Sequence, residues 1–170
     1  LAGFETPVYL NETVLEIEKE DDVFKIITNK GNHTSKTVII AMGGGAFTPR
    51  PLELDGVDTY QNIHYHVSNI QQYAGQKVTI LGGGDSAVDW ALAFEKIAPT
   101  TLVHRRDNFR ALEHSVQALQ ESSVTIKTPF VPSQLLGDGQ TLDKLEITKV
   151  KSDDTESIEL DHLFVNYGFK

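Results

Sequence analysis

The chain of 170 residues contains no cysteine. Disulfides, thiolate metal sites, cysteine nucleophiles and Cys-x-x-Cys redox chemistry are therefore excluded within this sequence. The sequence also lacks an apolar run of membrane-spanning length, and its N-terminus has no basic region followed by an apolar stretch. We therefore expect a soluble, cytoplasmic protein with no membrane partner.

Positive charge is scarce: 15 Lys and Arg stand against 24 Asp and Glu, which gives a net charge of -9 at pH 7. General binding of nucleic acid needs a net basic surface, so we expect no nucleic-acid partner. No Ser/His/Asp arrangement or carboxylate pair suggests a catalytic side chain. His64 and His66 lie two residues apart without a third ligand nearby, and we interpret them as surface or packing residues rather than a metal site.

The stretch from Lys77 to Ala87 combines a short apolar run, a glycine cluster and the start of a helical pattern. Gly82, Gly84 and Ala87 match the G-x-G-x-x-G/A pattern of dinucleotide binding. In that pattern the first glycine makes the turn, and the second lets the backbone approach a pyrophosphate. The stretch therefore predicts a strand, a nucleotide-binding turn and a helix, although a glycine-rich turn without a ligand remains the alternative.

The first turn of this helix supplies the groups that would meet the phosphates. Unpaired N–H groups around Gly84 to Ser86 would point at them along the helix dipole. Ser86 either donates to a phosphate or only caps the helix. Asp85 fits a helix-start residue better than an acid–base catalyst, because a carboxylate there complements the dipole.

A basic cluster follows the second strand, which we expect at Thr101 to Val103. His104, Arg105 and Arg106 stand where NAD-binding units carry an acidic residue for the ribose 2′-hydroxyl. Guanidinium groups instead bind the 2′-phosphate of NADP through bidentate, charge-assisted hydrogen bonds. The cluster therefore predicts NADP(H), with Arg110 closing the same pocket; the alternative is a basic surface loop paired with local carboxylates.

Residues 51–170 predict an α/β fold, with a Rossmann-like parallel sheet, helices and a β-meander layer. The two β-α-β units comprise strands at 77–81, 101–103 and 124–127 and helices at 85–97 and 111–120, and the meander and closing strand lie at 133–136, 142–150, 157–160 and 162–165. Residues 52–69 show no regular pattern. We expect this part to be a complete dinucleotide-binding domain.

Residues 1–50 predict a second, β-rich domain that ends at the connector Thr48 to Pro51. Strands are expected at 8–10, 13–18, 23–28 and 37–41, the last one buried in a parallel sheet, with core positions Val14, Ile17, Phe24 and Ile26. The order of meander, apolar strand and glycines repeats the end of the larger domain. We interpret it as the last part of a second nucleotide unit; a chance likeness between two meanders is the alternative.

With these residues in place, the sequence resembles the pyridine-nucleotide-disulfide oxidoreductase superfamily, and within it the thioredoxin-reductase-like ferredoxin–NADP reductases. Two stretches look like the family's NADPH motifs: the run Gly82, Gly83, Gly84, Asp85, Ser86 and Ala87, and the run from His104 to Arg110. The stretch 43–50 looks like the junction between the FAD and NADPH domains. The resemblance places Phe47 against the flavin.

The resemblance implies hydride transfer between NADPH and FAD, then electron transfer to ferredoxin or flavodoxin, in a homodimer when full length. No side chain here need be catalytic, and we expect this chain alone to bind NADPH without turning over. Thioredoxin reductases carry redox cysteines at the positions of Tyr65 and Ser68. The alternatives are a thiol/disulfide flavoprotein reductase with its cysteines elsewhere, and a non-catalytic NADP-binding module.

Overall fold

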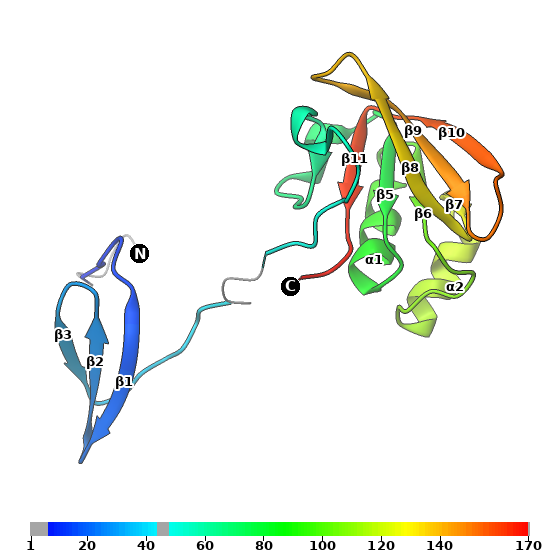
Figure 1. The fold of residues 1–170 in the computed structure, drawn as a ribbon. Coiled ribbons are helices and arrows are strands. Elements are labelled where there is room, and N and C mark those ends of the chain that lie inside the picture. The colour runs from blue at the N-terminus through cyan, green and yellow to red at the C-terminus, as the bar shows by residue number, and fades with distance from the viewer. Residues whose placement is uncertain (1–6, 44–47, 170) are drawn as a thin grey trace. The chain divides into compact units, whose positions relative to one another are not determined.

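The computed structural model describes residues 7–43 and 48–169. The chain divides into two compact units, Leu1–Gly45 and Ala46–Lys170 (Figure 1). The two units differ in how much apolar surface they bury.

The described residues of the smaller unit form an antiparallel sheet of three strands in the order β1-β2-β3. The strands are β1 (Val14–Glu20), β2 (Val23–Thr28) and β3 (Asn32–Ser35). The strands expected at 13–18 and 23–28 are confirmed within two residues. β3 was not expected, because its polar sequence Asn-His-Thr-Ser has no apolar alternation.

The strands expected at 8–10 and 37–41 are wrong. Neither stretch has strand structure, and Ile39 and Ile40 are 88% and 68% exposed. A parallel strand is stable only when neighbours on both sides accept its hydrogen bonds and cover its faces. No described residue pairs with this run, so its apolar composition alone does not make it a strand.

The residues expected to form the core of the smaller unit are more exposed than predicted. Val14 and Ile17 are 53% and 39% exposed, and Phe24 and Ile26 are only half-buried. Among the described residues of this unit only Thr28 is buried. A single three-stranded sheet has no second layer to bury its apolar face against.

The described part of the larger unit contains a parallel sheet of five strands in the order β4-β11-β5-β6-β7. The strands are β4 (Ile63–His64), β5 (Val78–Leu81), β6 (Thr100–Val103), β7 (Thr125–Lys127) and β11 (His162–Val165). Helices α1 (Asp85–Phe94) and α2 (Glu113–Glu121) connect β5 to β6 and β6 to β7. This arrangement confirms the predicted α/β class. β4 was missed within the stretch 52–69, which also holds the short 3-10 helix η1 (Val57–Thr59); a second 3-10 helix, η2 (Ile70–Tyr73), follows this stretch.

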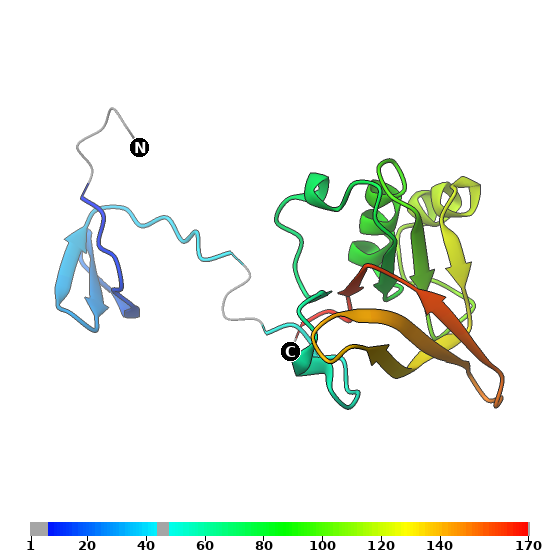
Figure 2. The same cartoon turned by 90° about the horizontal axis from the view of Figure 1, so that it is seen from above.

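The parallel sheet lies between the helices and a meander (Figure 2). The meander consists of β8 (Phe130–Gly137), β9 (Leu142–Lys149) and β10 (Thr155–Glu159). Because successive strand residues point to opposite faces, Ile80 of β5 packs on the helix side and Leu81 on the meander side. Both are fully buried, so β5 joins the two halves of the core.

Asn62 connects the parallel sheet to the meander. Its side-chain amide donates to the carbonyls of Leu142 and Asp161 at 2.8 and 2.7 Å, and its amide oxygen accepts from Leu142 N–H at 2.9 Å. The side chain is buried, and these bonds satisfy an amide that would otherwise be costly to desolvate. The starts of β4, β9 and β11 are thereby held at one point.

Candidate nucleotide-binding site

Gly82 lies at the carboxyl end of β5, where the strand order reverses between β6 on one side and β11 on the other. In open α/β sheets ligands bind at such a point. Gly82 has φ 150°, and a Cβ there would lie 2.5 Å from the carbonyl oxygen of Asn166. Only glycine fits this close approach, as the sequence pattern predicts.

Gly83 is covered by the imidazole of His104, which a Cβ at Gly83 would overlap. The imidazole also stacks on Phe109, with ring centroids 5.3 Å apart. Burial lowers the pKa of His104, and the charges of the neighbouring arginines act in the same direction. Its Nε2 atom is buried and has no hydrogen-bond partner among the described residues.

Gly84 caps the N-terminus of α1 with extended backbone and without a side-chain hydrogen bond. The nearest atom to a Cβ built on Gly84 is the carbonyl oxygen of Arg110, at 4.0 Å, so the approach to the helix start is open. Asp85 accepts a 2.8 Å hydrogen bond from Leu112 N–H, whereas Ser86 is exposed. Asp85 therefore ties the start of α1 to the start of α2.

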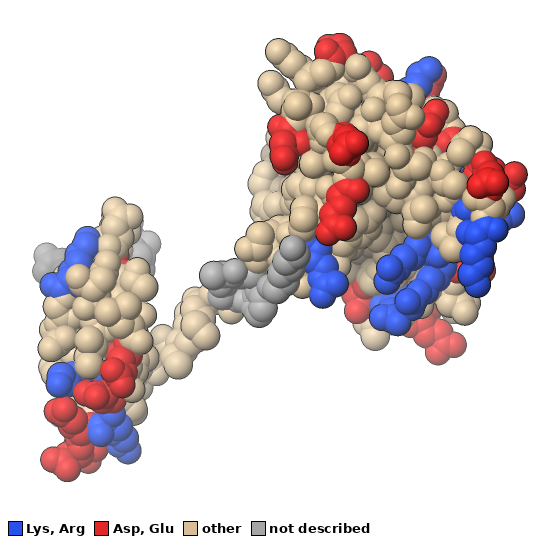
Figure 3. All heavy atoms as spheres, in the orientation of Figure 1, with Lys and Arg blue, Asp and Glu red and all other residues tan. Residues whose placement is uncertain are grey.

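The basic loop is bonded to the glycine turn through the main chain. Arg110 N–H donates to the carbonyl of Gly83 at 2.7 Å, and Arg110 forms an isolated parallel bridge with Gly84. The side chains of Arg105, Arg106 and Arg110 are exposed, and none has a carboxylate within 4.0 Å in the described part of the chain. This finding argues against a loop neutralised by local carboxylates (Figure 3 shows blue basic side chains gathered on the larger unit).

The turn and the loop open into a cleft of about 900 Å³. Eight of the predicted site residues line it: Gly82, Gly83, Gly84, Asp85, Ser86, His104, Arg105 and Arg110. Arg106 does not line it, and Phe47 lies outside the described residues. The sequence reasoning missed the walls contributed by residues 50–54, 130–132 and 166–168.

The carboxyl end of β11 forms one of these missed walls. Asn166 N–H donates to the carbonyl of Leu81 at 2.8 Å, which holds the end of β11 beside the glycine turn. Partial burial of Tyr167, which is 38% exposed, raises its pKa to about 12, with Arg105 opposing the shift and Tyr65 adding to it. The apolar run that ends at Asn166 was the available signal, because strand ends at this edge of a parallel sheet carry binding residues.

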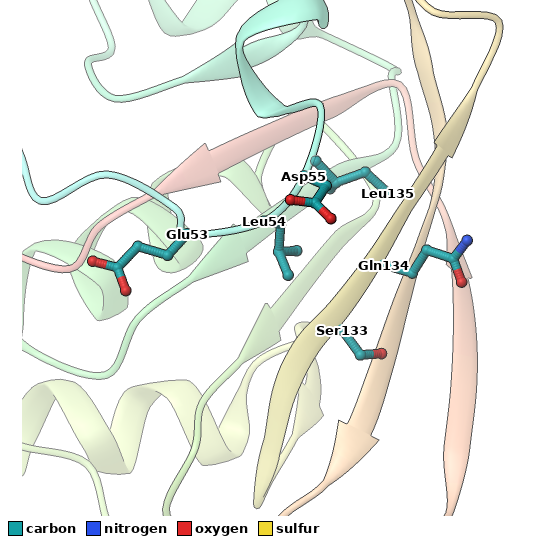
Figure 4. Close-up of a pocket in the computed structure, with 6 residues that line it drawn as sticks. All are labelled: Glu53, Leu54, Asp55, Ser133, Gln134 and Leu135. Carbon is teal, nitrogen blue, oxygen red and sulfur yellow. The ribbon is translucent and has the colours of Figure 1, made fainter.

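Another hollow, of about 740 Å³, lies beside the cleft and is lined by Glu53, Leu54, Asp55, Ser133, Gln134 and Leu135. Figure 4 shows these side chains on the segment 53–55 and on β8. Its lining has two carboxylates and no Lys or Arg, which is unfavourable for a phosphate, whereas the glycine cleft is also lined by Arg50, Arg105 and Arg110. We therefore place the candidate nucleotide site in the glycine cleft and not here.

His64 and His66 lie two residues apart in the sequence but have different surroundings. His64 Nε2 lies 3.0 Å from His162 Nδ1, and the ring packs on Tyr73 and Phe164, whereas His66 is exposed. No cluster of three or more His, Cys, Asp or Glu side chains suited to a metal occurs among the described residues.

No helix in the part of the chain that the structure describes is long and apolar enough to cross a membrane.

The sheet, its switch point and the glycine turn place the larger unit in the class of dinucleotide-binding α/β folds. The sequence profile of the family described as pyridine nucleotide-disulphide oxidoreductase matches residues 1–162. The chain therefore belongs to the pyridine nucleotide-disulphide oxidoreductase family.

Similar proteins agree with this family. The chain is 85% identical over its whole length to a ferredoxin–NADP reductase of Streptococcus pneumoniae serotype 2 and 66% identical to one of Streptococcus sanguinis. It spans 53% of the length of each. Among solved structures, thioredoxin reductase of Lactococcus lactis matches 92% of this chain and 52% of its own, with a TM-score of 0.72 and 30% identity.

Proposed function

We propose that this chain is the NADPH-binding part of a flavin-dependent ferredoxin–NADP reductase. The observation that carries the proposal is the set of arginines at 105, 106 and 110, which have no carboxylate partner among the described residues and are tied by main-chain bonds to a glycine turn at the switch point. In a chain with a net negative charge, a cluster of arginines without carboxylate partners indicates a site that binds an anionic ligand.

The residues present fit NADP(H). The open N–H groups from Gly84 to Ser86 would hold the pyrophosphate, and the arginines would hold the 2′-phosphate. His104 lines the same cleft and holds its imidazole over Gly83, between the glycine turn and the basic loop. The nucleotide supplies hydride chemistry when bound, while these residues bind and orient it.

The full-length protein is proposed to add FAD and a one-electron acceptor, ferredoxin or flavodoxin, and to act as a homodimer. The names of the Streptococcus relatives and the family support the flavin and the acceptor. Residues 1–50 would then belong to the FAD domain, with Phe47 against the flavin. The exposed apolar side chains of the smaller unit support this assignment, because they need another layer to cover them.

Thiol reduction is less well supported. The similar solved structures include thioredoxin reductases, but the chain has no cysteine. Tyr65 and Ser68 hold the positions that the redox pair would need. A non-catalytic NADP-binding module is less well supported too, since the relatives at 85% and 66% identity are named as reductases.

The proposal is tested by replacing Arg105 and Arg106 together with alanine and titrating the 170-residue chain with NADPH and with NADH by calorimetry. We expect the dissociation constant for NADPH to rise about 10- to 100-fold, because charge-assisted hydrogen bonds to the 2′-phosphate are lost. NADH lacks that phosphate, so its affinity should change less than about twofold.

Lys96→Ala removes an exposed positive charge elsewhere and serves as the matched control. Equal losses for both nucleotides would show that the 2′-phosphate binds elsewhere. In the full-length protein the double variant should lose NADPH-dependent reduction of ferredoxin at low NADPH and regain it at high NADPH. Activity that is unchanged at all concentrations would contradict the proposal.

A further inference from the structure

Residues 50–54 form one wall of the cleft that the glycine turn also lines. Before this wall, the main chain is joined to the segment after β11: Pro49 bridges Phe169, and Arg50 N–H donates to the carbonyl of Gly168 at 2.9 Å. Arg50 Nε also donates to the carbonyl of Phe169, at 3.1 Å. These bonds hold the beginning of the wall and leave its middle to other contacts.

The middle of the wall is held by Tyr65. The N–H of Leu52 donates to the hydroxyl of Tyr65 at 3.1 Å. Leu52 is 3% exposed, so its N–H has little access to water and depends on this partner. The tyrosine ring itself packs against the meander-side core that contains Leu52.

Tyr65 has a fixed place from which to do this. It directly follows β4, which pairs in parallel with β11 through Ile63 and His64. It therefore stands at the same carboxyl edge of the sheet as Gly82 and Tyr167. Tyr167 lines the same cleft as residues 50–54 and Arg105.

We infer that Tyr65 is a positioning residue of the nucleotide cleft, whose hydroxyl fixes the wall at residues 50–54 beside the carboxyl end of β11. The inference rests on the proposed function. The wall is bonded to the segment after β11, whereas Arg105 and Arg106 follow β6, on the other side of β5. It therefore serves the nicotinamide half of the nucleotide and not the adenosine half.

The test compares Tyr65→Phe with Tyr60→Phe in the 170-residue chain. Tyr60 packs against the same core, and no hydrogen bond of its hydroxyl occurs among the described residues, so the control removes an equivalent atom. The probes are NADPH and 2′,5′-ADP, measured by calorimetry. The second probe carries the 2′-phosphate and lacks the nicotinamide half.

For Tyr65→Phe we expect the dissociation constant of NADPH to rise about three- to tenfold, because binding must then order a freed wall, at a cost of up to the energy of the lost hydrogen bond. Binding of 2′,5′-ADP should stay within about twofold, and Tyr60→Phe should leave both ligands unchanged. Equal losses for both probes would show a general structural role and overturn the inference, as would no change in either.

Failure of the proposed function is a separate outcome. If the unsubstituted chain binds neither NADPH nor 2′,5′-ADP, the nucleotide site itself is refuted. If it binds both and Tyr65→Phe binds both equally well, the site stands and only the role of Tyr65 is refuted.

Discussion

The two units of this chain show the difference between forming strands and forming a core. The smaller unit has hydrogen-bonded strands, yet Val14, Leu15 and Ile17 are 53%, 65% and 39% exposed. The larger unit buries Phe94, Ile80 and Leu102 completely between its sheet and helices. Backbone pairing is local, whereas burial needs a second layer. Stability should therefore be concentrated in the larger unit.

Gly82 and Gly31 have nearly the same φ angle but different surroundings. A Cβ at Gly82, which has φ 150°, would crowd Asn166 and Ala87, whereas a Cβ at Gly31, which has φ 157°, would have no atom within 4 Å. We expect Gly82→Ala to cost about 4 kcal/mol, from strain and overpacking together. Gly31→Ala should cost about 1 kcal/mol, from strain alone.

Urea unfolding measures both costs. Trp90, the single tryptophan, lies on α1 and reports on the larger unit, while far-ultraviolet circular dichroism reports on both units. Gly31→Ala should leave the fluorescence midpoint unchanged. A fluorescence midpoint for Gly82→Ala close to that of the unsubstituted chain would mean that the turn relaxes, and the close packing argued for Gly82 would be wrong.

The next largest effect concerns buried and exposed asparagines. Asn62→Ala leaves two carbonyls and one N–H of the larger unit without partners, at a cost of about 2 kcal/mol. Asn29→Ala removes one exposed bond to Thr13 N–H in the smaller unit, at a cost of about 0.5 kcal/mol. The same two probes separate them, and equal costs would show that burial does not set the difference.

The smallest effect is a difference in pH response. Burial lowers the pKa values of His64 and His162 in the larger unit, and His162 lowers that of His64 further. As the pH falls, these two histidines are therefore protonated at a higher pH in the unfolded chain than in the folded chain. The stabilisation is fully present above pH 6.5, the ordinary histidine value, and is lost as pH falls below it through the folded pKa values.

The smaller unit should respond at lower pH. The hydrogen bond with His33 lowers the pKa of Glu12, so its stabilisation is present above pH 4.5 and lost as pH falls below that value. For the larger unit, the urea midpoint measured by tryptophan fluorescence should fall from pH 8 to 5, and His64→Phe should reduce this dependence on pH. A pH dependence unaffected by His64→Phe would refute this assignment.

The sequence predicts the larger unit best where the determinants are local. The apolar run of β5, the glycine turn and the helical spacing of α1 lie within twenty residues, and all three are found. The strand expected at 37–41 fails because its apolar run says nothing about a pairing partner. β4 was not predicted because its two residues form a strand only by pairing with β11, about a hundred residues later in the chain.

The candidate site divides in the same way. The glycines and the basic loop follow from motif spacing, and the structure brings them together at one cleft. The imidazole of His104 over Gly83 and the bond from Leu52 to Tyr65 join separate segments. The spacing of residues in the sequence does not indicate such contacts, so they are found only in the folded structure.

The main-chain bonds between Arg110 and the glycine turn bear on how cofactor preference can change. They fix the path of the loop without using the side chains of Arg105 and Arg106, which make no hydrogen bond or ion pair with the described residues. Those two side chains can be exchanged for acidic ones while the loop keeps its course. Under the proposed function, selectivity for NADP over NAD is thereby separable from folding, and we expect substitution of these two side chains alone to reverse it.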